Sequence, residues 1–502
     1  MDDLVKAIER RVTIASTHLT IVRNPDGFLL RPDVQQRVLK ECQLLLLPVS
    51  SSIQLRVRYE LIDKQSIEKV CYVMEKQFDV LPDLLKEIQT IPVFSLADLM
   101  PACNETELRQ AAMTFSMASY IYDKHYTYNL TTEQTRLVVN EAMMLYGEDP
   151  KSISEKLKAI KLEWDKVETI EAISTILLKA IGQNAYAAIE NTINDLNADF
   201  QKFVDSRYFS LSNTSHVKKP KMVNKVLPYL AYKHDRTDKI ALIVVDGMTY
   251  WQYLILHRKL KEAGLAPRKD CTFAWMPTIT KLSRQAIFRG DTPNHNYVQS
   301  PLHESELWME FWINYYDNSK RMHKHEVDYT HGSMLLSDAC PLRQAFVDVT
   351  LDDVMHHLPG NKDLFDVTEN WAKEAAKSIV DLHKQGFTVY ITTDHGNVYS
   401  HGWRNLLPKE KTFLYKNESR GQRHLMYQDD QAMFNFVESN IDIDKELLVH
   451  DKWIVWRTAK CFKNQDIITH GGAHFRTLYL EHPNNQNQPE IPNHKPLIDN
   501  TF

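Results

Sequence analysis

The sequence predicts an α/β protein whose C-terminal half forms a doubly wound, mostly parallel β-sheet, preceded by a small α/β domain and a helical region. From residue 238 onward, short apolar runs of the kind that form buried strands alternate with amphipathic helical segments. Residues 1–101 show the same alternation on a smaller scale. Residues 102–232 have helical periodicity with very little glycine or proline, and we expect them to form a helical region that ends in a linker.

The first predicted domain covers residues 1–101. It opens with an amphipathic helix in which Leu4, Ile8 and Val12 share one face. Short β-type runs follow at 18–23, 44–49, 56–61 and 70–74, and a helical stretch lies at about 33–41. Strands that alternate with helices in this way are typical of a small α/β domain.

The predicted core covers residues 233–482. Strands are expected at 239–246, 271–278, 345–350, 387–394 and 476–482, and helices at 250–264, from about 282, and at 367–386. In a sheet of this kind, ligands bind just beyond the carboxyl ends of the strands. Residues 483–502 are rich in proline and asparagine, and we expect them to form a loose tail.

Composition and charge argue against several classes of protein. The 502 residues carry 60 Lys and Arg against 65 Asp and Glu, a net charge of −5, whereas a nucleic-acid coat protein needs a strong basic excess. The longest apolar runs, at 44–47 and 240–245, are far shorter than the roughly 20 residues that span a membrane. The N-terminus is charged and the six cysteines form no CxxC pair, so we expect reduced thiols in a cytoplasmic protein.

Polar residues of a particular kind stand near the ends of the predicted strands. They are Asp246 after the first strand, Thr280 after the second, Asp352 with His356 after the third, Asp394 with His395 after the fourth, and His470 before the last. Each has an ordinary explanation, such as an Asp-Gly turn, a helix N-cap or a surface hydrogen bond. These explanations do not account for five such groups in one domain, so we expect the side chains to converge.

The chemistry that suits this set is phosphoester hydrolysis with two divalent metal ions. Carboxylate and imidazole ligands bind zinc or manganese and tolerate other divalent ions. Two ions about 3.5–4 Å apart can hold both the attacking and the leaving oxygen of an in-line displacement. A hydroxyl group at such a centre loses its proton easily and becomes a nucleophile at neutral pH.

The motifs VVDGM, PTITKLSR, LDDVMHH, TTDHG and HGG occur in this order, and together they resemble the PglZ domain, a branch of the alkaline phosphatase superfamily. The resemblance covers residues 238–482 and implies an alkaline-phosphatase-like fold. Proteins of this family are components of BREX-type phage defence systems in bacteria and archaea. The resemblance therefore implies other phage-defence proteins as partners, and it leaves the oligomeric state open.

The resemblance also implies a role for each candidate residue. Thr280 matches the nucleophile, and with Asp246, Asp394 and His395 it matches the ligands of one metal ion. Asp352, His356 and His470 match the ligands of the other ion. Asp353 and His357 have the same spacing as Asp352 and His356, so the sequence leaves this register open. The expected cofactors are two divalent ions, zinc first, with manganese or another divalent ion as the alternative.

Arg284 lies one turn after Thr280 on the predicted helix. There it can steady a phosphoryl oxygen, which makes it a candidate substrate-binding residue, or it can simply be an exposed helix residue. The predicted function is a metal-dependent phosphoester hydrolase, nuclease-like in the sense that the defence context implies a phosphodiester such as an oligonucleotide. The alternative is a metal-binding scaffold subunit of a phage-defence complex with little or no hydrolase activity.

Overall fold

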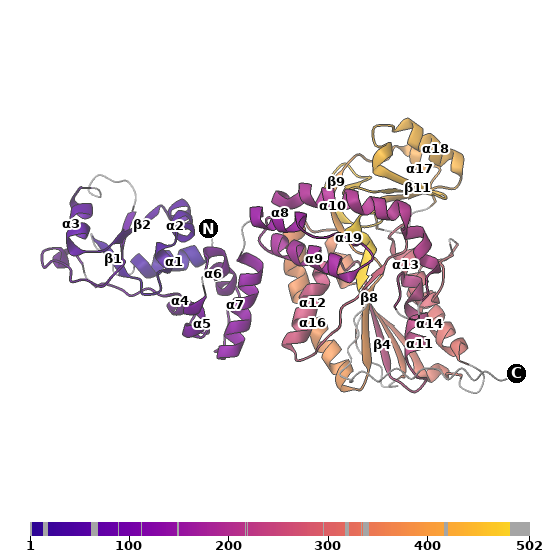
Figure 1. Cartoon of the computed structure of the whole chain (residues 1–502), viewed down its shortest axis with the longest axis horizontal. Helices are drawn as coiled ribbons and strands as arrows, with labels where there is room; N and C mark the ends of the chain where they lie inside the picture. Colours follow the sequence, from indigo (N-terminus) through magenta and orange to yellow (C-terminus); the bar gives the residue numbers. More distant parts are fainter. Residues whose placement is uncertain are drawn as a thin grey trace. The chain divides into compact units, whose positions relative to one another are not determined.

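The computed structural model describes residues 3–13, 19–61, 69–88, 90–111, 113–147, 150–215, 217, 219–294, 296–316, 321–332, 334, 341–415 and 420–481 (Figure 1). The predicted tail, 483–502, lies outside the described residues. The chain divides into two compact units, Met1–Ser152 and Ile153–Phe502, and the division falls inside the predicted helical region. Among the described residues, no helix has the length and apolar character needed to cross a membrane.

The first unit is built on a small parallel sheet in the order β1-β3-β2. Its strands are β1 (Thr20–Arg23), β2 (Leu44–Val49) and β3 (Lys69–Met74), close to three of the four predicted runs. Side chains alternate between the two faces, as the period of a strand requires. Val22 and Val73 enter one core with residues of α1 (Asp3–Thr13), whereas Ile21 and Tyr72 enter a second core on the other face.

The strand predicted at 56–61 is wrong, because these residues belong to helix α3 (Ser52–Leu61). The alternation of Arg and Val over four residues resembles a strand, but the wider segment carries helical signals. The Ser51 hydroxyl accepts a hydrogen bond from the amide of Gln54, as at a helix N-terminus, and Arg56 pairs with Glu60 four residues later. Among residues 52–60 of this helix, only Leu55 is fully buried.

Part of the predicted helical region packs in the first unit. These helices are α5 (Glu105–Gln110), α6 (Phe115–Tyr122) and α7 (Thr132–Tyr146), and they follow α2 (Pro32–Cys42), predicted at about 33–41, and α4 (Leu96–Leu99) of the predicted first domain. Ala118 of α6 and Ala142 of α7 lie in the same core as Leu4 of α1. The other helices, α8 (Pro150–Lys158), α9 (Val167–Gly182), α10 (Tyr186–Ser206) and α11 (Val226–Lys233), lead into the second unit.

The second unit is organised around a four-stranded parallel sheet in the order β6-β7-β4-β8. Its strands are β4 (Ile240–Val245), β6 (Val327–His331), β7 (Arg343–Asp348) and β8 (Thr388–Thr393). Helices α12 (Tyr250–Glu262) and α16 (Asn361–Lys384) lie on one side of the sheet, and α11, α13 (Thr280–Arg289) and α14 (Pro301–Tyr315) lie on the other (Figure 1). The doubly wound parallel architecture is therefore confirmed.

Two of the predicted strands take a different place from the one expected. Strand β5 (Cys271–Phe273) is shorter than predicted and pairs antiparallel with β15 (Tyr479–Glu481), outside the four-stranded sheet. Helix α19 (Phe475–Leu478) replaces the start of the last predicted strand. Strand β6, which the sequence did not suggest, fills the edge of the sheet instead, and its polar, only partly buried residues explain why it shows no apolar run.

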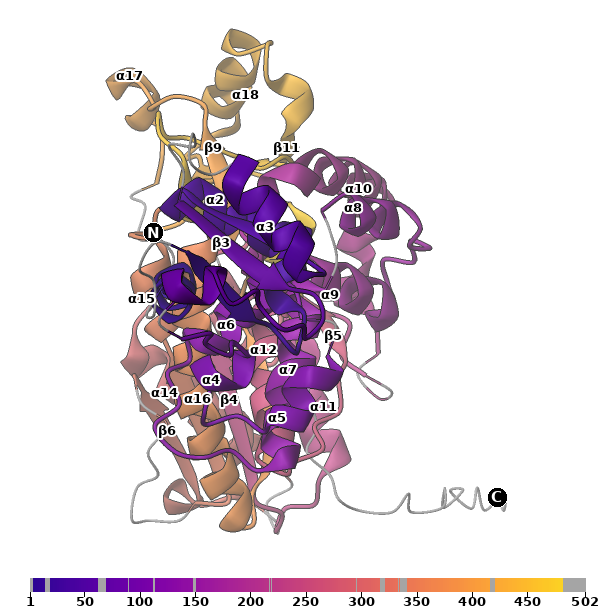
Figure 2. The same cartoon turned by 90° about the vertical axis from the view of Figure 1, so that its left-hand side faces the viewer.

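A small lobe, residues 398–469, stands at one end of the second unit (Figures 1 and 2). It contains β9 (Val398–Gly402), β13 (Lys460–Cys461) and β14 (Ile467–Thr469) in one sheet, and β10 (His424–Met426), β11 (Leu447–His450) and β12 (Trp453–Trp456) in another. Helices α17 (Pro408–Lys411) and α18 (Asp430–Ser439) accompany them. Leu425, Phe436 and Trp456 belong to a separate apolar core of this lobe.

Candidate metal centre

The register of the central sheet brings two acidic residues side by side. Val245 of β4 pairs with Thr393 of β8, so Asp246 and Asp394 are the first residues beyond two neighbouring parallel strands. Both carboxylates are buried, Asp394 completely. Gly247, with φ of +73°, turns the chain directly after Asp246, and its amide donates to Asp394 Oδ1 over 3.2 Å. The strand ends therefore fix both carboxylates in one place.

The first ligand group consists of Asp246, Asp394 and His395, whose ligand atoms all lie within 4.8 Å of one another. His395 Nε2 is 3.4 Å from Asp246 Oδ1 and 3.7 Å from Asp394 Oδ2. Thr280 Oγ1 lies 3.1 Å from the same nitrogen. Thr280 is the first residue of α13 and does not cap it, because the N-cap position belongs to Ile279. Its hydroxyl is therefore directed to the ligand group, and the ordinary N-cap explanation for Thr280 does not apply.

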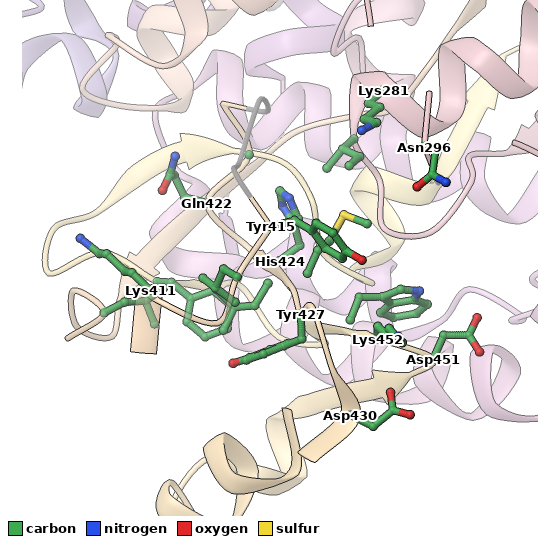
Figure 3. A pocket seen from close by; sticks show the side chains of 18 of the residues that line it. Lys281, Asn296, Lys411, Tyr415, Gln422, His424, Tyr427, Asp430, Asp451 and Lys452 are labelled. Atoms are coloured by element: carbon green, nitrogen blue, oxygen red, sulfur yellow. The ribbon is translucent and has the colours of Figure 1, made fainter. Parts of the chain in front are cut away.

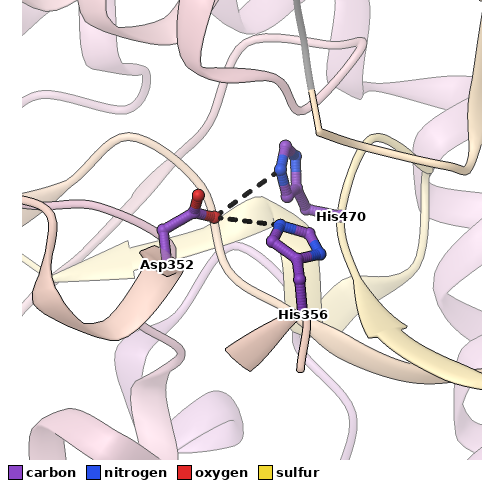
Figure 4. A group of neighbouring side chains, drawn as sticks. All are labelled: Asp352, His356 and His470. Atoms are coloured by element: carbon purple, nitrogen blue, oxygen red, sulfur yellow. Dashed lines mark ion pairs between the residues drawn. The ribbon is translucent and has the colours of Figure 1, made fainter. Parts of the chain in front are cut away.

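The second ligand group consists of Asp352, His356 and His470 (Figure 4). Asp352 lies in α15 (Thr350–Met355), the short helix after β7, and His356 caps that helix. Asp352 Oδ1 is 3.4 Å from His356 Nε2 and 3.7 Å from His470 Nε2. The other ring nitrogen of His470 is 3.1 Å from the carbonyl oxygen of Thr278, a contact that orients the ring.

The structure distinguishes the two registers that the sequence left open. Asp352 is 5% exposed and faces His470, whereas Asp353 points outward and pairs with Arg420 over 2.7 Å. His357 is exposed. A residue one position along a helix is rotated by about 100°, so only one of the two pairs can face the strand ends. The Asp352 and His356 pair takes that place.

The two ligand groups adjoin each other. The rings of His395 and His470 stack with 3.9 Å between their centroids and 14° between their planes. Residues from the ends of β4, β7 and β8, from the start of α13 and from the turn after β14 thus meet in one site. All seven predicted ligand residues are brought together.

Arg284 is buried rather than exposed, and its guanidinium faces carboxylates. Its Nε donates to Asp394 Oδ2 over 2.9 Å, and one terminal nitrogen bonds to Asp246 Oδ2. The other terminal nitrogen is 3.4 Å from Glu304 Oε1. These three carboxylates hold the pKa of Arg284 well above its usual range against the opposing effect of burial. The predicted contact between Arg284 and a phosphoryl oxygen stays a prediction.

Burial and neighbouring charges shift the pKa values of three ligand residues in different directions. Burial raises the pKa of Asp246 well above its usual range, and Asp394 adds to this effect against the charge of Arg284. Burial also opposes ionisation of Asp352, but its close contact with the His356 ring holds the pKa of Asp352 below its usual range. Burial lowers the pKa of His470 well below its usual range, so the ring is neutral at pH 7 and able to act as a ligand.

The site fits a divalent cation because four of its buried polar atoms lack a hydrogen-bond partner among the described residues. These atoms are Asp246 Oδ1, Asp352 Oδ1, His356 Nε2 and His470 Nε2. A buried polar atom without a partner costs roughly 1–3 kcal/mol, and few such atoms occur in native proteins. The four atoms are those that face the other members of their ligand groups. Oxygen and imidazole nitrogen donors are the set that zinc and manganese accept.

Two charged residues of the site were not predicted. Glu304 in α14 is completely buried and contacts Arg284. Its position four residues before Trp308 and eight before Trp312 places it on the buried face of an amphipathic helix, a signal that could have identified it. Arg420 is 3.6 Å from Asp352 Oδ2, but it lies in a loop, and no local pattern marks it.

Comparison with known protein families confirms the resemblance found in the sequence. Residues 224–479, just over half of the chain, match the family described as the BREX system PglZ alkaline phosphatase-like domain. No curated protein matches the chain.

Several solved structures resemble part of the chain. Murine ectonucleotide pyrophosphatase / phosphodiesterase 5, as an inactive variant in complex with AMP, is 12% identical, with a TM-score of 0.32 over 49% of this chain and 87% of its own. The human protein of the same name is 15% identical, with a TM-score of 0.33 over the same shares. Phosphonoacetate hydrolase from Sinorhizobium meliloti 1021 is 12% identical, with a TM-score of 0.30 over 51% of this chain and 92% of its own.

Proposed function

This chain belongs to the family of BREX system PglZ alkaline phosphatase-like domains, and we propose that it is a metal-dependent phosphoester hydrolase with Thr280 as its nucleophile. One observation carries the proposal. The hydroxyl of Thr280 lies 3.1 Å from His395 Nε2, beside two buried groups of carboxylates and imidazoles that include unpartnered ligand atoms. A nucleophile next to a concentration of metal-ligand atoms is the arrangement that phosphoryl transfer needs.

In the proposed site, Asp246, Thr280, Asp394 and His395 hold one divalent ion, and Asp352, His356 and His470 hold the other. Zinc is the expected ion, with manganese or another divalent ion as the alternative. When bound, the two ions supply positive charge that favours the ionised form of a hydroxyl and offsets the charge on phosphate oxygens. The protein supplies a rigid frame, because each ligand stands at or near the end of a strand or a helix.

The reaction of Thr280 then follows from its position. Thr280 Oγ1 attacks phosphorus, the bond between phosphorus and the leaving oxygen breaks, and the leaving alcohol takes up the proton that the threonine released. Water then attacks the phosphothreonine, which restores the hydroxyl and releases the phosphate product. Two hydrogen bonds hold the turn before Thr280 in place. Thr278 Oγ1 donates to the carbonyl of Gly472 and accepts from the amide of Gly471.

We propose a phosphodiester as the substrate class. A monoester presents one more charged oxygen, and enzymes that cleave monoesters usually meet it with an additional basic group. Two buried arginines of this unit, Arg284 and Arg423, are engaged with other groups, and Arg420 beside Asp352 is paired with Asp353. Arg284 faces three carboxylates, and Arg423 donates to the backbone carbonyls of Lys460, Trp456 and Thr458. The family match supports a role in phage defence, with other defence proteins as partners.

The test is hydrolysis of a model phosphodiester, bis(4-nitrophenyl) phosphate, and a model monoester, 4-nitrophenyl phosphate, in zinc, manganese and magnesium. We expect the diester to be cleaved faster, and Thr280→Ala to lower the rate by about a thousandfold or more. The same variant should keep its bound metal. Thr292→Ala, an exposed threonine outside the site, is the matched control.

Unchanged hydrolysis by the Thr280→Ala protein would overturn Thr280 as the nucleophile. A metal-loaded chain that cleaves neither ester, together with a Thr280→Ala protein that still protects cells from phage, would instead support the scaffold function.

A further inference from the structure

A large cavity opens beside the candidate metal centre. It has a volume of about 1220 Å³ and lies between the start of α13 and the small lobe (Figure 3). Ile279 and Lys281, the neighbours of Thr280, line one side. Gly421 and Gln422 line the cavity close to His470. The Gln422 amide donates a hydrogen bond to Oγ1 of Thr469, the neighbour of His470, over 3.1 Å. Gly421 packs against the His470 ring so closely that a Cβ atom at this position would lie 3.0 Å from Nδ1. The cavity therefore adjoins both Thr280 and the second ligand group.

The cavity is larger than a small phosphate ester requires. Pockets for compact organic ligands have volumes of about 300–1,000 Å³. A site built only for a short alcohol ester of phosphate would leave most of this space to water. Its size and position indicate that the group attached to the phosphate is itself bulky.

Aromatic and aliphatic side chains form much of the wall. Tyr415 and Phe434 each have about half of their surface exposed, 51% in both cases, although both are large apolar side chains. Trp453 and Phe462, which are buried, belong to the same wall. Exposed aromatic faces beside buried apolar ones provide a stacking surface for flat rings, and nucleobases bind to such surfaces with little regard to sequence.

The charges in the lining favour an anionic ligand. Four lysines, Lys281, Lys411, Lys452 and Lys463, and two aspartates, Asp430 and Asp451, contribute to it. The lining therefore carries two more positive than negative side chains, although the whole chain has a net charge of −5. Lysines spaced around an aromatic wall can contact successive phosphates of a strand while its bases stack.

Tyr427 belongs to the same wall, but it is 2% exposed and its hydroxyl is buried, so it supports the wall and makes no polar contact with a ligand. In Figure 3, Lys411, Tyr415 and Tyr427 appear on the lobe side of the cavity and Lys281 on the opposite side.

We propose that this cavity binds the nucleoside part of a nucleotide-containing phosphodiester, with a base on the Tyr415 side of the wall and an adjoining phosphate near Lys411. The proposal rests on the proposed hydrolase function for the identity of the phosphate that is cleaved, but binding itself needs no turnover. A mononucleotide and the end of a single strand share this chemistry.

The test is calorimetric titration of the full chain carrying Thr280→Ala and loaded with zinc, with thymidine monophosphate and with the single-stranded trinucleotide of thymidine. We expect Tyr415→Ala to weaken the Kd about tenfold, because the variant loses the ring on which a base stacks. Tyr232→Ala is the matched control, since Tyr232 is similarly exposed, at 57%, and does not line the cavity. Equal affinities for the two ligands assign a single nucleotide, and tighter binding of the trinucleotide assigns a strand.

A second pair of variants tests the charge. Lys411→Gln should weaken trinucleotide binding and reduce the slope of log affinity against log salt by about 0.7, the value for one phosphate contact on a single strand. Lys409→Gln, on the same helix but outside the lining, should leave both unchanged. Tyr415 and Lys411 are exposed, so their replacement leaves the core of the lobe intact.

Affinities that are the same in the Tyr415 and Lys411 variants as in their controls would overturn the proposal. Tighter binding of a short-chain phosphatidylglycerol, with the same dependence on Tyr415, would also overturn it and assign a lipid phosphodiester. Because the titration uses an inactive chain, its outcome is separate from that of the hydrolysis experiment. Nucleotide binding without hydrolysis in the wild type would defeat only the proposed function, and hydrolysis without cavity-dependent binding would defeat only this inference.

Discussion

Arg284 and Glu304 form an ion pair in the interior of the second unit, with 3.4 Å between a terminal guanidinium nitrogen and Oε1. Glu304 is completely buried, and it also accepts hydrogen bonds from Tyr329 and Gln299. The pair connects the candidate metal centre to α14, because the same guanidinium contacts Asp246 and Asp394. The cation of Arg284 is thus shared by three buried carboxylates.

This sharing predicts that Arg284→Gln destabilises the metal-free chain more than the zinc-loaded chain. Removing one partner of a buried ion pair costs about 3–5 kcal/mol, because the remaining charges lose their compensation. Zinc at Asp246 and Asp394 would replace part of that charge. Urea unfolding with zinc and with EDTA measures both values. Arg289→Gln, on the same helix, is the control, and an equal loss in both conditions would show that the two cations do not substitute for each other.

The second ligand group predicts a change in metal content. Asp352→Asn should remove one of two zinc ions per chain, since Asp352 is the only carboxylate of its group. Asp353→Asn should keep both ions, because Asp353 is 50% exposed at its side chain and faces Arg420. Elemental analysis after zinc loading and gel filtration gives the stoichiometry. Loss of zinc from the Asp353 variant alone would reverse the assigned register.

Removal of metal is expected to lower the melting temperature of the chain. An ion that binds only the folded state stabilises it by about 2.7 kcal/mol when its free concentration is a hundred times the Kd. Scanning calorimetry of the same preparation with zinc and with EDTA measures this shift. A chain that lacks one carboxylate of each ligand group, the double variant Asp352→Asn with Asp394→Asn, should show a much smaller shift on addition of EDTA.

Acid should destabilise the second unit through His257. Burial lowers the pKa of this residue to about 4, with contributions from Lys269 and Lys261. The unfolded chain has a histidine pKa of about 6.5, so it binds more protons than the folded chain between these two values. The stability is therefore complete above pH 6.5 and falls by about 3 kcal/mol as the pH drops towards 4.

The measurement for His257 is the slope of the unfolding free energy against pH, in wild type and His257→Gln. Between pH 4 and 6.5, the unfolding free energy of His257→Gln should depend less on pH than that of the wild type. This difference in slope does not depend on the stability of the variant at neutral pH. The exposed His325→Gln is the control. Identical slopes for the wild type and His257→Gln would contradict the prediction.

Much of the central sheet could be predicted because its information is local. Strand β4 is a continuous apolar run, β8 is a run of β-branched and aromatic residues, and each is followed directly by the acid that the strand-end rule marks as a ligand position. The strand at 56–61 and the long strand at 271–278 were wrong because short alternating or apolar stretches do not distinguish a strand from a helix or a loop. At 52–61 local helix signals outweighed the alternation, whereas after Phe273 a contact with a distant residue holds the chain. The carbonyl of Ala274 accepts a hydrogen bond from Tyr208.

The residue types, their order and their spacing along the chain were enough to identify the candidate ligands, because metal chemistry requires particular donor atoms and strands deliver them to one edge. Which of Asp352 and Asp353 faces that edge, where the guanidinium of Arg284 points, and what surrounds Thr280 were decided only when the chain folded. The orientation of a side chain and the shape of a cavity depend on residues hundreds of positions apart, and no local pattern contains that information.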